Sequence, residues 1–434
     1  MQKKAEKLKI WYKLDNAAKV FPGQNSSSWS NIYRVSVTLT EKIDPLLLEK
    51  AVKTTLKRFP CFDVRMRRGF FWNYFEKNPN EAPPVLPDIA NPCHRMLWYE
   101  NKRFLFRVYY YEKRISIEFH HTLSDAYGAS RFVMTVVAVY LRLTGKSIPC
   151  GESVLDIDEE PREQEMEDAF LRYATSKVKS KRSRGFVYHF KAKRLPKHHI
   201  SVTTGYMPVS ALKEAAHKYG ATITEFLAAA LLETMYSLQL EQNKIKPKPV
   251  SVQIPVNLRN TFPTETLRNF SLCYSVKIDP RRGEYTFEEI INQISHYLRY
   301  INNPKELNAM MTGNIGLERN PVMRALPLAV KNLAIGLAFK MTGEKTVSAL
   351  ISNVGIIKTP PELTQYIEKL MIMTGPGVIN GSRCASVSYN GTLALSVANI
   401  FESTAIQRVL FTTLVKHGVP VKIESNKIFG EESD

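Results

Sequence analysis

The chain has 434 residues, of which 44% are hydrophobic, 10% aromatic and 23% charged, and this composition excludes a wholly disordered or low-complexity protein. The 60 Lys and Arg against 41 Asp and Glu give a net charge of +19, which favours anionic partners. Nucleic acid, anionic lipid, acidic proteins and phosphorylated small molecules all satisfy that preference, so charge alone does not choose among them.

The cysteines are odd in number and scattered, with no CxxC pair and no Cys/His spacing typical of zinc, which predicts free thiols and no metal site. The basic N-terminus is followed by Trp11-Tyr-Lys-Leu-Asp15 rather than by an apolar segment, which argues against a signal peptide. The most apolar later stretch, 325–341, is interrupted by Pro327, Lys331 and Lys340. We therefore expect no transmembrane segment and a cytoplasmic location.

The first half of the chain alternates between strand and helix periodicity. Asp44-Pro45 predicts the start of a helix whose apolar stripe ends at Phe59, and a second helix is expected from Gly128 to Gly145. Alternation of apolar and polar residues predicts strands with one buried face. The strands expected here are 34–40, 70–75, 103–111 and 114–121.

Composition shifts between residues 149 and 200. An acidic block, 156–168, precedes a basic run, which we interpret as a connector between domains, part helix and part loop. A solvated surface explains the basic run more simply than a specific phosphate site does. The run contains Lys177, Lys179, Lys181, Arg182, Arg184, Lys191, Lys193, Arg194 and Lys197.

The second half repeats the mixed pattern. A helix is expected over 210–219, and Thr222-Ile-Thr-Glu225 and Thr286-Phe-Glu-Glu289 are capping boxes that each open another helix. The expected strands are 250–256, 271–278, 385–389 and 392–397, the last two joined by a turn at Asn390-Gly391. Each half thus combines a sheet with covering helices, which predicts a mixed α/β protein of two domains.

One polar segment, His120-His121-Thr122-Leu123-Ser124-Asp125, lies where a buried strand ends before a helix. A neutral histidine there can take a proton near pH 7, because its unperturbed pKa is about 6.5. Asp125 can fix the loop or the histidine tautomer. The segment therefore suits a general base, the alternative being two loop histidines beside an aspartate that caps the helix.

This HHxxxD segment resembles the HHxxxDG signature of the chloramphenicol-acetyltransferase-like superfamily, which includes nonribosomal-peptide condensation domains, plant BAHD acyltransferases, wax ester synthases and alcohol acetyltransferases. The resemblance implies two acetyltransferase-like halves, 1–175 and 201–434, joined by a basic connector, 176–200, and arranged as a V with a tunnel between them. It also implies that His121 is the general base and that His120 is a supporting neighbour.

Further segments extend the resemblance. Ile254-Pro-Val-Asn-Leu-Arg259 is similar to the family segment whose arginine pairs with the motif aspartate, which implies a structural ion pair between Asp125 and Arg259. The segment Thr266-Leu-Arg-Asn-Phe270 follows at the usual distance. One departure is Ala126, which stands where the family usually has glycine, while Gly128 comes two residues later. This departure predicts either a more crowded tunnel or a looser turn.

Ile351-Ser-Asn-Val-Gly355 resembles a later family segment that approaches the tunnel, so Ser352 or Asn353 can donate a hydrogen bond to a developing oxyanion. A polar turn at the end of a strand explains these two residues equally well. The aromatic cluster 70–75 is interpreted as the core of a strand, with the lining of an acyl pocket as the alternative.

The resemblance implies an acyltransferase that moves an acyl group, acetyl first, from a CoA thioester to an alcohol or amine by direct attack. Acyl-CoA is then a co-substrate and not a bound cofactor. The positive charge suits the phosphates of CoA or an acidic acyl-carrier protein. Two alternatives are a condensation-type amide synthase that uses carrier-bound thioesters and a non-catalytic binding member of the superfamily. No RRM, KH, helix-turn-helix or zinc-finger signature supports a specific nucleic-acid partner.

Overall fold

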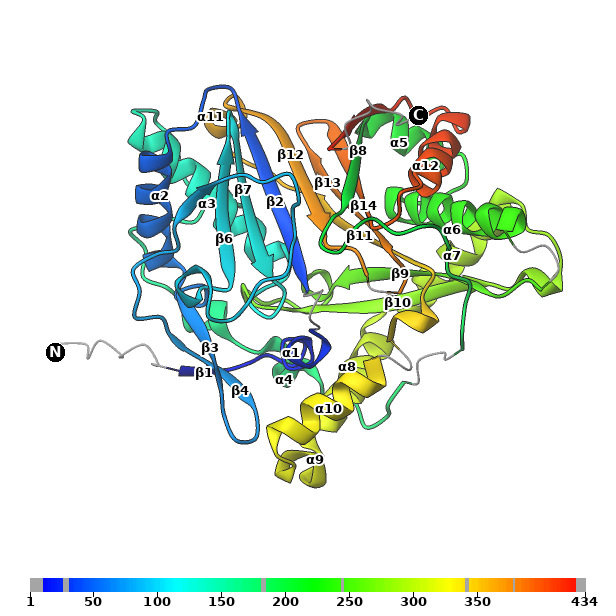
Figure 1. Ribbon diagram of the computed structural model, residues 1–434, viewed down its shortest axis with the longest axis horizontal. Coiled ribbons are helices and arrows are strands. Elements are labelled where there is room, and N and C mark those ends of the chain that lie inside the picture. Colours follow the sequence, from blue (N-terminus) through cyan, green and yellow to red (C-terminus); the bar gives the residue numbers. More distant parts are fainter. Residues whose placement is uncertain are drawn as a thin grey trace.

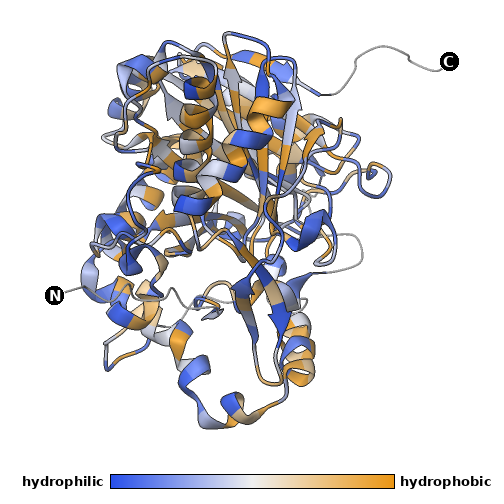
Figure 2. Ribbon diagram, turned by 90° about the vertical axis from the view of Figure 1, so that its left-hand side faces the viewer, coloured by the Kyte–Doolittle hydropathy of each residue, from blue (hydrophilic) through white to orange (hydrophobic). Residues whose placement is uncertain are grey.

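The computed structural model describes residues 11–25, 31–180, 185–242, 246–339, 343–377 and 379–426. Within these ranges the strands form three sheets, and the two larger sheets lie side by side with helices covering each (Figure 1). Apolar residues are concentrated on the interior strands and polar residues on the outer turns (Figure 2). The architecture is the mixed α/β fold that the sequence predicts.

The first large sheet contains the strand that carries the histidines. Its strands, in spatial order, are β12 (Ile367–Thr374), β2 (Ile32–Leu39), β7 (Arg114–His120), β6 (Phe106–Tyr111) and β5 (Val85–Pro87). Two helices cover it, α2 (Pro45–Arg58) and α3 (Ala126–Leu143). Asp44 caps α2 by accepting the backbone N–H groups of Leu46 and Leu47, as Asp44-Pro45 predicts.

The polar face of this sheet is buried as well as the apolar face. Glu118 on β7 accepts hydrogen bonds from Arg34 Nε at 2.9 Å and from Arg107 Nη2 at 2.7 Å. Burial raises the pKa of Glu118, but the two guanidinium groups outweigh that effect and lower it. The strand that leads to His120 is therefore held by buried charge pairs on one face and by apolar packing on the other.

Strand β12 reaches the first sheet from late in the chain. It pairs antiparallel with β2, and its Leu370 and Ile372 are buried in the same core as Val35 and Val37. A division of the chain at residue 201 would assign β12 to the second half. In space, however, β12 belongs to the first sheet. The helix α11 (Pro361–Thr364) precedes it.

The second large sheet is built from the second half of the chain. Its spatial order is β10 (Ser271–Ile278), β9 (Val250–Asn257), β11 (Ala349–Ile356), β13 (Ser382–Tyr389), β14 (Thr392–Asn399), β8 (Ser201–Pro208) and β15 (Lys422–Ser425). Its helices are α5 (Val209–His217), α6 (Ile223–Gln242), α7 (Phe287–Ile301) and α12 (Ala405–Lys416).

Local signals in this half are confirmed. Thr222 and Glu225 exchange side-chain hydrogen bonds with each other's backbone N–H groups, and Thr286 and Glu289 do the same. The turn Asn390-Gly391 joins β13 to β14 with φ values of 42° and 77°, the left-handed conformation that this residue pair tolerates.

A small third sheet lies below the first in Figure 1. It consists of β1 (Trp11–Lys13), β4 (Asn73–Lys77) and β3 (Val64–Arg68). The prediction of one strand over 70–75 is wrong, because the backbone N–H of Gly69 bonds to the carbonyl of Trp72 and closes a turn between β3 and β4. Phe70 and Phe71 lie in this turn and are 72% and 45% exposed, so they are not strand core.

Further helices complete the lower part of the molecule: α1 (Phe21–Gln24), α4 (Ala169–Tyr173), α8 (Pro304–Arg319), α9 (Pro321–Ala325) and α10 (Leu328–Ala338). No helix in the described ranges is both long enough and apolar enough to cross a bilayer.

The connector departs from expectation in one respect. Residues 176–180 and 185–200 form no helix, and their only strand-like pairing is a bridge between Arg194 and Phe401. The basic side chains Lys181, Arg182 and Arg184 lie outside the described residues.

Candidate active site

The two histidines lie at the end of β7, in a turn that we call the histidine loop (residues 120–125). The loop is held by backbone hydrogen bonds from His121 N to Asn31 O and from Leu123 N to His120 O, each 2.8 Å long. It ends at Asp125, which caps α3 by accepting the backbone N–H groups of Tyr127 and Gly128. A strand end, a tight turn and a helix start therefore fix the positions of both imidazoles.

His120 is fully buried. Its Nδ1 accepts the backbone N–H of Thr122 at 3.2 Å, and its ring lies 4.6 Å from the ring of Trp98. Burial lowers the pKa of His120 to about 3, and the nearby His121 and Arg107 act in the same direction. This imidazole is neutral at physiological pH and has no open side for a substrate, which suits the supporting part that the resemblance implies.

His121 differs because its side chain is only partly covered. Its ring stacks on Phe21 and is tilted against Tyr33, with centroid distances of 4.9 Å in both cases. Its Nδ1 lies 3.1 Å from Oδ1 of Asn269. Because an amide oxygen can only accept, the proton lies on Nδ1 and the lone pair lies on Nε2.

Burial also lowers the pKa of His121, and the hydrogen bond to Asn269 and the charge of Asp125 oppose that shift. The neutral form is therefore dominant at pH 7. A neutral imidazole with a fixed tautomer and an unprotonated Nε2 is the form that a general base requires.

Asn269 is oriented in turn by a buried carboxylate. Its Nδ2 donates to Oδ2 of Asp15 at 3.2 Å, and Asp15 also accepts the backbone N–H of Ala18 at 2.8 Å. Burial raises the pKa of Asp15. Arg268, whose Nε lies 3.6 Å from Oδ2, opposes that rise but does not cancel it. The contact with Asp15 points the amide oxygen of Asn269 toward His121. The sequence offers no spacing rule that links residues 15, 121 and 269, so this chain of contacts was not predicted.

Asp125 and Arg259 form the expected ion pair, with Arg259 Nη1 2.8 Å from Asp125 Oδ2 and side chains that are only 8% and 5% exposed. Arg259 also donates to the carbonyl oxygens of Thr266 and Arg268, and Asp125 accepts the backbone N–H of Phe270 at 2.8 Å. No hydrogen bond joins Asp125 to the imidazole of His121 among the described residues. The aspartate is placed to hold the loop against residues 257–270, which we call the arginine segment.

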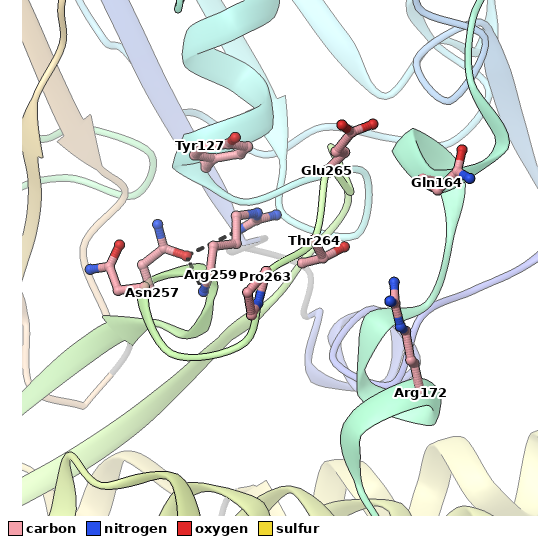
Figure 3. A pocket seen from close by; sticks show the side chains of 9 residues that line it. Tyr127, Gln164, Arg172, Asn257, Arg259, Pro263, Thr264 and Glu265 are labelled. Atoms are coloured by element: carbon pink, nitrogen blue, oxygen red, sulfur yellow. Dashed lines mark hydrogen bonds between the residues drawn. The ribbon is translucent and has the colours of Figure 1, made fainter.

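A polar cavity of about 510 Å³ opens beside this ion pair. Figure 3 shows Arg259 next to Tyr127, with dashed lines to Asn257. The guanidinium of Arg259 lies 4.2 Å from the centre of the Tyr127 ring, and that of Arg131 lies 3.9 Å from the same ring. Two cations thus share one aromatic ring at the start of α3.

Close packing explains why glycine stands at position 128, two residues after the position where the family usually has it. A Cβ at Gly128 would lie 2.0 Å from the carbonyl oxygen of Leu267 and 2.4 Å from Oγ of Ser124. The close approach of α3 to the arginine segment therefore requires glycine at 128. Ala126 is the first residue of α3 and packs against the first core, where its methyl group is accommodated.

Ser352 and Asn353 lie on β11, and both are partly buried. Asn353 donates its amide to Oγ1 of Thr224 at 2.9 Å and accepts the backbone N–H of Gly355 at 3.1 Å. Among the described residues no hydrogen bond connects either residue with His121. The structure therefore brings together His121, Asn269 and Asp15 and, beside them, Asp125 and Arg259.

Comparisons with known proteins identify the family and the fold. A family model described as alcohol acetyltransferase matches residues 175–416, which is more than half of the chain. No curated protein sequence matches the chain.

Solved structures with the same fold cover nearly the whole chain. Polyketide synthase associated protein 5 from Mycobacterium tuberculosis is 16% identical over 93% of this chain and 96% of that one, with a TM-score of 0.57. The starter condensation domain of rhizomide synthetase RzmA is 13% identical over 94% and 95%, with a TM-score of 0.58. Trichothecene 15-O-acetyltransferase from Fusarium sporotrichioides is 13% identical over 94% of each chain, also at 0.58. At these identities the likeness shows the two-lobed condensation and acetyltransferase fold alone.

Proposed function

The chain belongs to the alcohol acetyltransferase family, and from that premise we propose that it transfers an acyl group, acetyl first, from a CoA thioester to the hydroxyl or amine of an acceptor. The observation that carries the proposal is the state of His121: neutral, partly exposed and held through Nδ1 by Asn269. Such a base needs only an acceptor on its Nε2 side.

In the proposed reaction Nε2 of His121 takes the proton of the acceptor while the acceptor oxygen or nitrogen attacks the thioester carbonyl. The new C–O or C–N bond forms, and the C–S bond then breaks. The departing thiolate takes the proton back from the imidazolium, which returns His121 to its neutral form. No covalent acyl-enzyme is required.

The neighbouring residues have distinct parts in this proposal. Asn269 fixes the tautomer of His121, and Asp125 with Arg259 holds the histidine loop. Ser352 and Asn353 are the candidates for stabilising the oxyanion. Ser352 suits that role better, because the amide of Asn353 already donates to Thr224.

The test is to measure release of CoA thiol from acetyl-CoA with a panel of alcohols and amines. We expect release that depends on the acceptor and on His121, with steady-state kinetics of a ternary complex. An acylated serine or cysteine that is trapped by mass spectrometry and is competent for transfer would contradict the direct mechanism. Thiol release that persists unchanged in His121→Ala would contradict the assignment of the base.

A second candidate is amide or ester formation from carrier-bound thioesters. The observation in its favour is the exposure of basic side chains along the connector, including Lys177, Lys179, Lys191 and Lys197, which would face an acidic carrier protein. Running the same assay with an acyl-loaded carrier protein in place of acetyl-CoA separates the two donors. We place the reaction in the cytoplasm, because no disulfide joins the cysteines of the described residues.

A further inference from the structure

A second cavity, of about 610 Å³, lies where the small third sheet faces helices α4, α8 and α9. Its walls are largely apolar and include Trp11, Phe71, Trp72 and Leu171. Trp11 is 54% exposed, Phe71 45% and Leu171 42%, although each is large and apolar. A concave, aromatic-lined cavity of this size is typical of a small-molecule site. Part of the aromatic cluster 70–75, which was expected to form the core of a strand, thus lines this cavity.

The rim of this cavity is positively charged. Lys13, Arg319 and Arg324 line it with exposed side chains that have no ion pair or hydrogen bond to a described residue. Glu318, the acid in the lining, is already paired with Lys19 and also accepts from Asn16. The lining therefore offers unpaired cations and no free carboxylate.

A buried cation lies behind the aromatic wall. The Lys331 side chain is fully buried, and its Nζ lies 3.9 Å from the centre of the Trp72 ring. It donates to the carbonyl oxygens of Phe71 at 3.0 Å and Arg324 at 3.2 Å, and no carboxylate of the described residues lies within ion-pair distance. Burial lowers the pKa of Lys331, and this lysine does not itself line the cavity, so the exposed Lys13, Arg319 and Arg324 supply the charge that a bound anion would meet.

We propose that this cavity binds an apolar carboxylate, with its alkyl or aromatic body against Trp11 and Trp72 and its carboxylate toward Arg319 and Arg324. Arginine pairs with carboxylates through two parallel hydrogen bonds, which suits a lining that contains two arginines. The site is separate from the polar cavity beside Arg259.

The bound molecule would touch the same segment that positions the candidate base. Leu14 and Lys19 line the cavity, while Asp15 between them orients Asn269 and Phe21 stacks on His121. The proposal nevertheless does not depend on acyl transfer, because its test measures binding directly.

The experiment titrates the full chain with decanoate and follows tryptophan fluorescence and calorimetric heat. We expect saturable binding, tighter than that of decanol, which has the same alkyl chain without the charge. The double variant Arg319→Gln/Arg324→Gln should bind decanoate about tenfold more weakly and decanol equally well. The matched control Arg282→Gln/Arg408→Gln removes the same charge from exposed positions of the second half and should bind like the wild type.

A second variant tests the cavity wall. Leu171→Glu places a carboxylate in the lining at a half-exposed position that tolerates a polar side chain, and it should also weaken decanoate binding. Equal affinities for decanoate and decanol, or decanoate binding that survives both Leu171→Glu and the rim double variant, would overturn the proposal. Unchanged melting curves of the variants would show that any loss is local.

Discussion

The histidine loop and the arginine segment meet at the candidate site but contribute different groups. The histidine loop comes from the first sheet and carries both imidazoles. The arginine segment connects β9 to β10 of the second sheet and contributes Arg259, Asn269 and backbone carbonyls, but no base. The histidine loop therefore carries the candidate base, and the arginine segment supplies the groups that align it. Variants of the base and of the ion pair should therefore separate turnover from stability.

The largest effect is expected at His121. His121→Ala should lower kcat/KM by about 10²- to 10⁴-fold, because general-base catalysis is commonly worth that much, and it should leave the melting temperature near that of the wild type. Activity on a confirmed acceptor and thermal unfolding measure the two quantities. The exposed His199 offers a matched control, since His199→Ala removes an imidazole that touches nothing in the site. If both variants kept wild-type activity, the base would lie elsewhere.

The ion pair that joins the two segments should respond in the opposite way. Asp125→Ala and Arg259→Ala should each cost about 3–5 kcal/mol of unfolding free energy, because each leaves one buried charge unpaired. The double variant should lose much less than the sum, since no charge is then left alone. Chemical denaturation of all four proteins gives the coupling. Additive losses would mean that the two charges act independently in spite of their contact.

The smallest expected effect concerns alignment and appears in the pH profile. Only the neutral form of His121 is active, and burial lowers the pKa of this histidine. As the pH is lowered, kcat/KM should therefore keep its plateau value past pH 6.5. It should fall only when the pH drops through the lowered pKa. The hydrogen bond to Asn269 raises that pKa. Asn269→Ala should therefore move the acid limb to lower pH and reduce the plateau by about tenfold, since the tautomer is no longer fixed.

Measuring kcat/KM against pH distinguishes an effect of Asn269 on the imidazole of His121 from a loss of activity caused by a damaged fold. Asn260→Ala, an exposed position on the same segment, serves as the control and should keep both plateau and limb. A lower plateau in Asn269→Ala with an unmoved acid limb would mean that Asn269 supports the fold without acting on the imidazole.

Local signals in the sequence predicted much of the fold. The expected strand 271–278 coincides with β10, and both capping boxes are present, because each depends on residues close together in the chain. The prediction of a strand over 70–75 was wrong because this aromatic run has almost no polar residues to mark a period. The sequence pattern therefore did not indicate the turn at Phe70 and Phe71. The ion pair of Asp125 with Arg259 was expected only through the family resemblance.

The remaining features depend on contacts that no local pattern encodes. The partner of β12 is chosen by the packing of Leu370 and Ile372 into the first core, which periodicity cannot assign to one sheet or the other. Asn269 does not titrate and belongs to no spacing rule, and its part becomes visible only when its amide is seen between Asp15 and His121.

Strand β12 also bears on how the protein is made. The histidine strand β7 is synthesised in the first third of translation, yet β2 beside it stays an edge strand until residues 367–374 have left the ribosome. An open edge exposes unpaired backbone groups that can pair with other chains. We therefore expect this edge of the sheet to stay open through most of the protein's synthesis, and a product truncated before residue 367 cannot complete the sheet that leads into the histidine loop.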